Sequence, residues 1–161
     1  MKDNPQFKLM RHIETVRNYL QACIGELGKR GIEHDQSKLQ EPELSVFHKH
    51  TPKLRKLVYG SDEYKKGIKE MYPAIEHHHA NNRHHPEYFQ NGMEGMNLFD
   101  LLEMLCDWKA ACFRHDDSDV FRSITINQKR FKYSDDIAKL LWNTMNYMED
   151  NFNITHHGDE S

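Results

Sequence analysis

Histidine is concentrated in one short stretch of this chain. The segment from Glu76 to Glu87 contains five histidines, at positions 77, 78, 79, 84 and 85. Histidine is both a neutral metal ligand and a proton carrier near neutral pH, so such a density indicates a site that handles a metal ion, a phosphate group or a proton. The alternatives are a solvated histidine-rich tract or an affinity tag. A tag normally lies at a terminus, whereas this stretch lies in mid-chain.

A second candidate pair, His34 and Asp35, lies nearer the start of the chain. Neighbouring residues on a helix point about 100° apart, so these side chains can share one metal ion only from a helix end or a turn. His12 lies farther upstream, beside the apolar edge of a predicted helix, where it could point inward. A lone histidine in such a position is more often structural, so its assignment depends on the other candidates.

Three acidic residues, Asp100, Glu103 and Asp107, follow the spacing i, i+3 and i+7 within an apolar stretch. This spacing places them on one face of a helix. Burial of an uncompensated carboxylate is costly, so acids on a strongly apolar helix must be paired, hydrogen-bonded or metal-bound. The alternative is that they form the solvated face of the helix. Spacing alone leaves both interpretations open.

These residues must be positioned by helices, since apolar residues recur every three or four positions through most of the chain. The first helix is expected to end at Gly28 or Gly31, and Pro52 should kink the second helix or divide it in two. Ser61 and Asn97 are typical N-cap residues. Helices are predicted over residues 6–29, 42–58, 61–79 and 97–115, from 120 onward, and from the capping residue 134 onward.

The same pattern contains no alternating strand and no internal repeat. The sequence therefore predicts an all-α fold, in which a single compact domain of about six helices covers residues 1–152. Residues 153–161 lack periodicity and are predicted to form a flexible tail.

Composition limits the classes of function. The chain has 161 residues, enough for one domain, and a net charge of −3 with scattered basic residues. These features allow a small anionic substrate but do not indicate an extended nucleic-acid surface. No apolar run reaches the length of a membrane span, and the start lacks the apolar stretch of a signal peptide. Three cysteines without a CxxC pair indicate buried thiols in a reducing compartment, which predicts a cytoplasmic protein; monomer and homodimer are both allowed.

Taken in chain order, the candidates are a His, a His-Asp doublet, a group of His and an Asp. This order resembles the HD-domain superfamily of metal-dependent phosphohydrolases, which are all-helical. The stretch from His34 to Lys38, followed by Glu43, looks like the small bacterial 5′-deoxynucleotidase branch, although Lys38 replaces an acidic residue of that branch.

The whole chain more closely resembles an uncharacterised family of phage and bacterial proteins, over about residues 10–145. If the protein is phage-encoded, its compartment would be the host cytoplasm. The resemblance rests on these motifs: His34-Asp35-x-Ser37-Lys38, Asn82-Arg83-His84-His85-Pro86-Glu87, Asp100-Leu101-Leu102-Glu103-Met104-Leu105-Cys106-Asp107-Trp108, and Asn127-Gln128-Lys129-Arg130-Phe131 with Asn143-Thr144.

The HD resemblance implies one or two divalent metal ions, drawn from Mn, Fe, Co, Ni, Zn or Mg. Asp100 is favoured over Asp107 as the acidic ligand because Phe99-Asp100-Leu101-Leu102 matches the apolar-Asp-x-Leu pattern of the superfamily. Asp107 lies about 10 Å farther along the helix axis and would orient a histidine or hold the substrate. The implied first site contains His12, His34, Asp35 and Asp100. The implied second site contains His78 with His84 or His85, bridged by Asp35, and His84 is favoured over His85 there.

The function that this resemblance implies is hydrolysis of a nucleotide or a related small phosphate ester. Glu43, Lys38 and Asp107 are the candidate catalytic residues. Candidate substrate-binding residues are Arg83, His85, Lys129 and Arg130, since a guanidinium group offers a fork of donors to phosphate. Two alternatives stay open: a di-iron oxygenase on the same fold, and a non-catalytic phage protein that binds a nucleotide.

Overall fold

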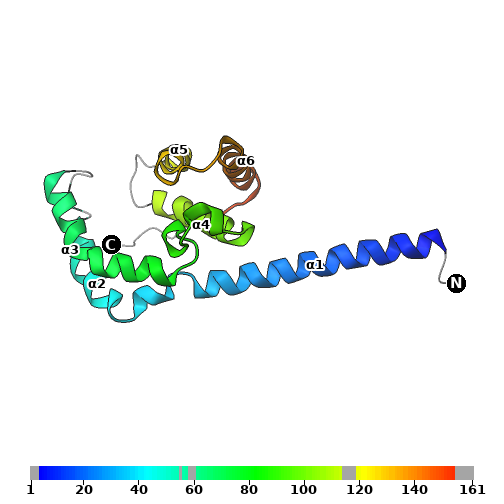
Figure 1. Ribbon diagram of the computed structural model, residues 1–161, viewed down its shortest axis with the longest axis horizontal. Helices are drawn as coiled ribbons and strands as arrows, with labels where there is room; N and C mark the ends of the chain where they lie inside the picture. Colours follow the sequence, from blue (N-terminus) through cyan, green and yellow to red (C-terminus); the bar gives the residue numbers. More distant parts are fainter. Residues whose placement is uncertain (1–3, 55, 58–60, 114–118, 155–161) are drawn as a thin grey trace. The chain divides into compact units, whose positions relative to one another are not determined.

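The computed structural model describes residues 4–54, 56–57, 61–113 and 119–154. Within these ranges the chain is helical and contains no strand, which confirms the predicted all-α class with six α-helices (Figure 1). By its internal contacts the chain divides into two units, residues 1–36 and 37–161. Most of the predicted tail, residues 155–161, lies outside the described ranges. The helices are α1 (Pro5–Glu33), α2 (Glu43–Leu54), α3 (Asp62–Asn81), α4 (Leu98–Cys112), α5 (Val120–Phe131) and α6 (Asp135–Asn151).

The first unit consists of α1 and the turn that follows it. The side chain of Asn4 accepts a hydrogen bond from the backbone N–H of Gln6 (2.9 Å) and caps the helix. The predicted end at Gly28 or Gly31 is wrong, because α1 continues to Glu33 with His34 as its C-cap. A glycine inside a helix costs about 1 kcal/mol relative to alanine, which weakens the helix without ending it.

In the second unit, capping residues set the helix starts as predicted. Ser61, Asn97 and Ser134 each accept a hydrogen bond from a backbone N–H in the first turn of α3, α4 and α6 respectively. Short polar side chains suit this position because the first N–H groups of a helix have no partner within the helix. Pro52 does not divide the second helix, since α2 continues through it to Leu54.

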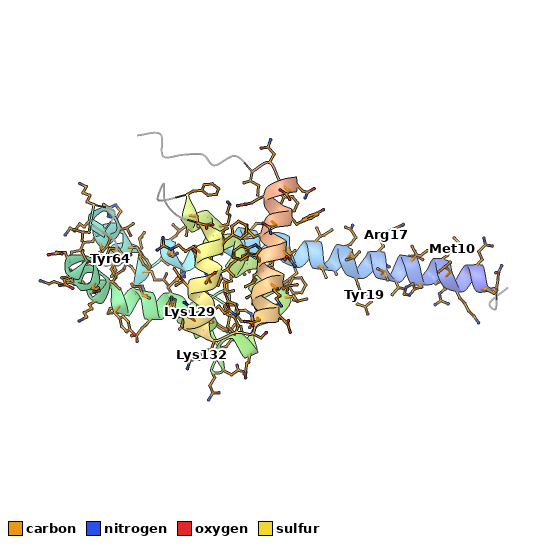
Figure 2. The ribbon with its side chains drawn as sticks, turned by 90° about the horizontal axis from the view of Figure 1, so that it is seen from above. Met10, Arg17, Tyr19, Tyr64, Lys129 and Lys132 are labelled. Carbon is orange, nitrogen blue, oxygen red and sulfur yellow. The ribbon has the colours of Figure 1, made fainter. Side chains whose placement is uncertain are left out.

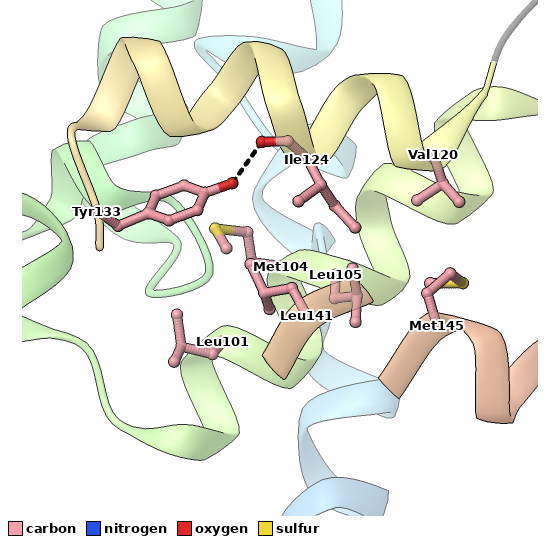
Figure 3. Close-up of a cluster of buried hydrophobic side chains, with 8 residues drawn as sticks. All are labelled: Leu101, Met104, Leu105, Val120, Ile124, Tyr133, Leu141 and Met145. Atoms are coloured by element: carbon pink, nitrogen blue, oxygen red, sulfur yellow. Dashed lines mark hydrogen bonds between the residues drawn. The ribbon is translucent and has the colours of Figure 1, made fainter. Parts of the chain in front are cut away.

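The core of the second unit is formed by α4, α5 and α6 (Figure 3). Met104, Leu105, Ile124 and Met145 are at most 1% exposed at its centre. The hydroxyl of Tyr133 donates a hydrogen bond to the carbonyl oxygen of Ile124 at 2.6 Å and ties the end of α5 to this core. Because α4 buries one face here, its acidic face is left for the segment that follows α3.

None of the helices in the described part of the chain combines the length and the apolar character needed to cross a membrane.

Candidate metal centre

Three histidines meet where α3 ends. His78 lies in the last turn of α3 and is 3% exposed, and His84, after the end of the helix, is 2% exposed. The chain bends at Asn82, so His84 and His85 return toward His78. The ring centroids lie 4.8 Å apart for His78 and His85 and 4.1 Å apart for His84 and His85. One ring nitrogen of each of the three lies within 4.8 Å of the other two.

A buried carboxylate fixes the orientation of the first ring. Glu43, at the start of α2, is fully buried, and its Oε2 lies 3.0 Å from Nδ1 of His78. The Oε1 atom of Glu43 lies 2.7 Å from Nδ1 of His77, and Ser37 donates a hydrogen bond to Oε2 at 3.0 Å. A carboxylate on Nδ1 favours the tautomer in which Nε2 carries the lone pair, as in carboxylate–histidine–metal triads.

The Nε2 atom of His78 lies 2.9 Å from Nε2 of His85. Two imidazole nitrogens at this distance either share a proton or act as ligands of one ion. Burial lowers the pKa of His85 to about 2, with the neighbouring His84, His79 and His78 adding to the shift. His85 therefore stays neutral in neutral solution, which is the state that a metal ligand requires.

The acidic face of α4 runs beside the segment from Arg83 to His85. Asp100 accepts hydrogen bonds from Arg83, and Oε1 of Glu103 lies 3.2 Å from Nδ1 of His84. The negative charge of Asp107 raises the pKa of His85 and so partly offsets the effect of burial. The spacing left open whether Asp100, Glu103 and Asp107 form a solvated face of the helix. They do not, because they are buried or half-buried and face charged or titratable partners.

Asp100 has a different role from the predicted metal ligand. Its Oδ1 accepts from Nε of Arg83 (3.2 Å), and its Oδ2 accepts from Nη2 of Arg83 (3.1 Å) and from the backbone N–H of Asn97 (2.9 Å). With Asn97 it forms a capping box at the start of α4. Asp100 belongs to none of the metal-capable groups found in the described ranges. The spacing Asn97-x-x-Asp100 was the sequence signal for this role.

Arg83, predicted to bind substrate, is held by Asp100. Its guanidinium group also lies over the ring of Phe89, 4.9 Å from the centroid. The hydrogen bond to Asp100 is the main cause of the raised pKa of Arg83. The fork of Arg83 is therefore directed at a protein carboxylate in this structure.

His12 lies about two turns after the start of α1, and His34 is the C-cap of the same helix. With a rise of about 1.5 Å per residue, the 22 residue steps from His12 to His34 span about 33 Å. One ion cannot bind both residues of the same chain, so the predicted set of His12, His34, Asp35 and Asp100 is corrected on this point. The helix expected from the sequence already implied this separation, and its length was the signal that was missed.

His34 and Asp35 lie at a helix end, which is the position that sharing one ion would require. His34 caps α1, and Asp35 follows in the left-handed region with φ of 57°. Aspartate tolerates this conformation better than most residues. The turn brings Nε2 of His34 to 3.6 Å from Oδ2 of Asp35, so the two side chains can act together.

A cavity of about 470 Å³ adjoins the histidines in the second unit. His79, His85 and Glu87 line it and form a second group that could hold a metal ion. Arg130, although exposed, also lines it and donates a hydrogen bond to Glu87 at 2.7 Å, whereas Lys129 lies outside the lining. Burial lowers the pKa of His79. The remaining lining residues include Trp108, Ser123, Asn127 and Phe131.

Lys38, predicted to be catalytic, does not line the cavity beside the histidines. Its ammonium group is 5.8 Å from the centroid of the Phe47 ring. It lines a separate, largely apolar cavity of about 540 Å³ together with Leu44, Phe47 and Lys56.

The structure also shows polar residues that sequence reasoning did not assign to the site. Asn82 donates hydrogen bonds to Ser37 and to the carbonyl oxygen of His78, both at 2.8 Å, and so fixes the end of α3. Glu103 orients His84. The i, i+3, i+7 spacing of the acids on α4 had indicated Glu103 as a candidate. No spacing in the sequence indicates that Ser37 contacts Asn82.

Fold and site together define a helical protein with a cluster of histidines and acids that could hold a metal ion. The chain belongs to the family of unknown function DUF5662, whose model matches residues 1–153. No curated protein and no solved structure matches the chain. The matched range includes every residue described above for the site, and membership assigns no activity to it.

Proposed function

We propose that this protein is a metal-dependent hydrolase of a small phosphate ester, most simply a nucleotide. The observation that carries the proposal is the convergence of the buried His78 and His84 with the half-buried His85. Imidazole nitrogens suit Zn, Fe, Co and Ni, and burial of the rings favours their neutral, metal-binding form.

Each residue of the centre has a defined task in this proposal. His78, His84 and His85 would hold the ion, while Glu43 and Glu103 orient the first two rings through Nδ1. When bound, the ion would polarise a phosphoryl oxygen and lower the pKa of an attacking water. The resemblance stated from the sequence adds Asp35 as a bridging ligand and assigns His34 to a separate first site. That addition stays a prediction.

The cavity beside the histidines is the proposed place for the substrate. Arg130 lines this cavity, and its guanidinium group would offer two parallel N–H donors to a phosphate group. Its partner Glu87 holds the guanidinium in place before substrate arrives. The indole of Trp108 and the amide of Asn127 are suited to stack on and hydrogen-bond to a nucleobase, which is the reason for favouring a nucleotide.

The first test is metal content followed by turnover. The purified protein is analysed for bound metal and then screened, with each divalent ion, against nucleoside mono-, di- and triphosphates and cyclic dinucleotides. We expect bound metal and release of phosphate or a nucleotide product. A bound ion with no turnover of any phosphorylated compound would contradict the hydrolase. Iron together with an oxygen-dependent reaction would instead favour the oxygenase alternative.

The second test assigns the ligands. His78→Ala and His84→Ala are expected to lose metal and activity while the helical content is kept. His48→Ala is the matched control, because His48 is exposed and belongs to none of the metal-capable groups in the described ranges. Asp35→Ala tests the ligand predicted from sequence alone. Full metal content in the His78 and His84 variants would refute the proposed centre.

A further inference from the structure

The apolar residues of α1 follow a heptad pattern. Their spacing alternates strictly between four and three residues over nearly the whole helix. This a/d repeat is typical of a coiled-coil seam, and Met10 and Ile24 extend its apolar surface on one side. The seam consists of Leu9, Ile13, Val16, Leu20, Cys23 and Leu27.

Nothing within the first unit covers this seam. The unit contains one α-helix, and none of its described residues is buried. Leu9 and Leu20 are each 58% exposed and Ile13 is 50% exposed. Three glycines at positions 25, 28 and 31 weaken the helix further, and none has a neighbour within 4 Å of the position a Cβ would take. A helix of this composition needs a packing partner, because helical stability in proteins comes mostly from packing of an amphipathic face.

We propose that α1 pairs with α1 of a second copy of this chain, in antiparallel orientation. A two-fold axis beside Asn18 would place Leu9 opposite Leu27 of the second copy. The same axis would place Ile13 opposite Cys23 and Val16 opposite Leu20. Every layer of the seam then combines one a position with one d position, and the surface is self-complementary, as a two-fold interface requires.

The residues that flank the seam favour this orientation over a parallel one. The antiparallel register places His12 opposite Glu26 of the second copy and Met10 opposite Ile24. Oε1 of Glu26 accepts a hydrogen bond from Arg30 of its own helix (2.7 Å), which leaves Oε2 for His12. A parallel pair would instead place His12 beside Arg17.

Near the axis, Tyr19 would meet Tyr19 on one side and Arg17 would meet Arg17 on the other. Figure 2 shows Tyr19 on the opposite side of α1 from Arg17. The Tyr19 pair adds contact area to the seam. The long side chain of Arg17 can direct its charge into solvent, away from its copy.

The test begins with the molar mass in solution, measured by light scattering over a range of concentrations. We expect twice the chain mass of 19.2 kDa. Leu20→Asp, within the seam, should raise the dissociation constant of the dimer at least 100-fold. Asn18→Asp adds the same charge on the outer face and should leave the dimer intact. A monomeric wild type at every concentration would overturn the proposal and indicate that α1 packs on its own chain.

Cross-linking tests the orientation without a destabilising charge. In a background with Cys106→Ser and Cys112→Ser, the substitution Ile13→Cys should give a disulfide-linked dimer with Cys23 of the second copy under mild oxidation. Positions 13 and 23 of one helix are about 15 Å apart, so a link within one chain is excluded. Cys23 alone should not cross-link. A dimer linked through Cys23 alone would show a parallel pair and overturn the antiparallel arrangement.

Discussion

At the scale of single residues, the centre is organised by contacts on the ring nitrogens that face away from it. Glu43 lies against Nδ1 of His78, and Glu103 lies against Nδ1 of His84. A carboxylate in this position fixes ring orientation and makes the opposite nitrogen more basic. Glu43, predicted from sequence as a catalytic acid or base, is therefore better explained as a residue that positions His77 and His78.

This role of Glu43 predicts the behaviour of Glu43→Gln. The amide keeps the shape of the side chain but removes the negative charge that aligns the two rings. We expect metal affinity to fall by about 10- to 100-fold, the usual effect of losing such a contact, with helical content retained. Isothermal titration with Zn or Co measures the change.

Glu76→Gln is the matched control, since Glu76 precedes His77 but is exposed. Its metal affinity should equal that of the wild type. If the Glu43 variant binds metal as tightly as the control while losing activity, Glu43 is a catalytic group and the positioning role is wrong.

At the scale of the helix, α4 has two functions on two faces. One face carries Leu101, Met104 and Leu105 into the core with α5 and α6, and the other carries the acids that face Arg83 and His84. Rigid packing of the first face fixes the second. The stability of this core is therefore relevant to the geometry of the centre, and Tyr133 offers a way to measure it.

Burial raises the pKa of Tyr133 to about 12 in the folded chain, compared with about 10 in an unfolded one. Between pH 10 and 12 the unfolded chain therefore releases this proton while the folded chain keeps it. Stability must then fall as the pH rises through this range. Tyr133→Phe should lose about 1 kcal/mol at pH 8, because the hydrogen bond to Ile124 is removed. Above pH 10 the difference in free energy of unfolding between this variant and the wild type should shrink.

Urea unfolding at pH 8 and pH 10.5 measures both effects. Tyr147→Phe serves as the control, because Tyr147 is 63% exposed. If the loss of stability in Tyr133→Phe is the same at both pH values, Tyr133 ionises alike in the folded and the unfolded chain.

The helices could be predicted from the sequence wherever their signals are local. Ser61, Asn97 and Ser134 cap helices as expected, because a cap depends on one side chain and the next three residues. The predicted end of α1 was wrong because Gly28 and Gly31 only weaken the helix, which ends instead just before the left-handed turn at Asp35. The pairing of His84 with Glu103 depends on the path of the chain after α3, which no local pattern specifies.

At the scale of the whole molecule, metal binding and folding should be coupled. His78 and His84 lie in or just after α3, and their orienting acids lie on α2 and α4, so an ion at the centre would link three helices. A ligand that binds only the folded state stabilises it in proportion to the logarithm of its concentration, by about 2.7 kcal/mol at 100 times the dissociation constant. For a chain of this size, about 1 kcal/mol corresponds to a shift of about 2–4 °C in Tm.

We therefore expect removal of metal with a chelator to lower Tm by about 5–10 °C, and restoration of the ion to reverse the change. Differential scanning calorimetry on dialysed samples measures it. His48→Ala should show the wild-type shift, whereas the double variant His78→Ala/His84→Ala should show none, because its folded state no longer binds the ion preferentially. An equal shift in the double variant would place the stabilising ion elsewhere, and the histidines at the end of α3 would then need another explanation.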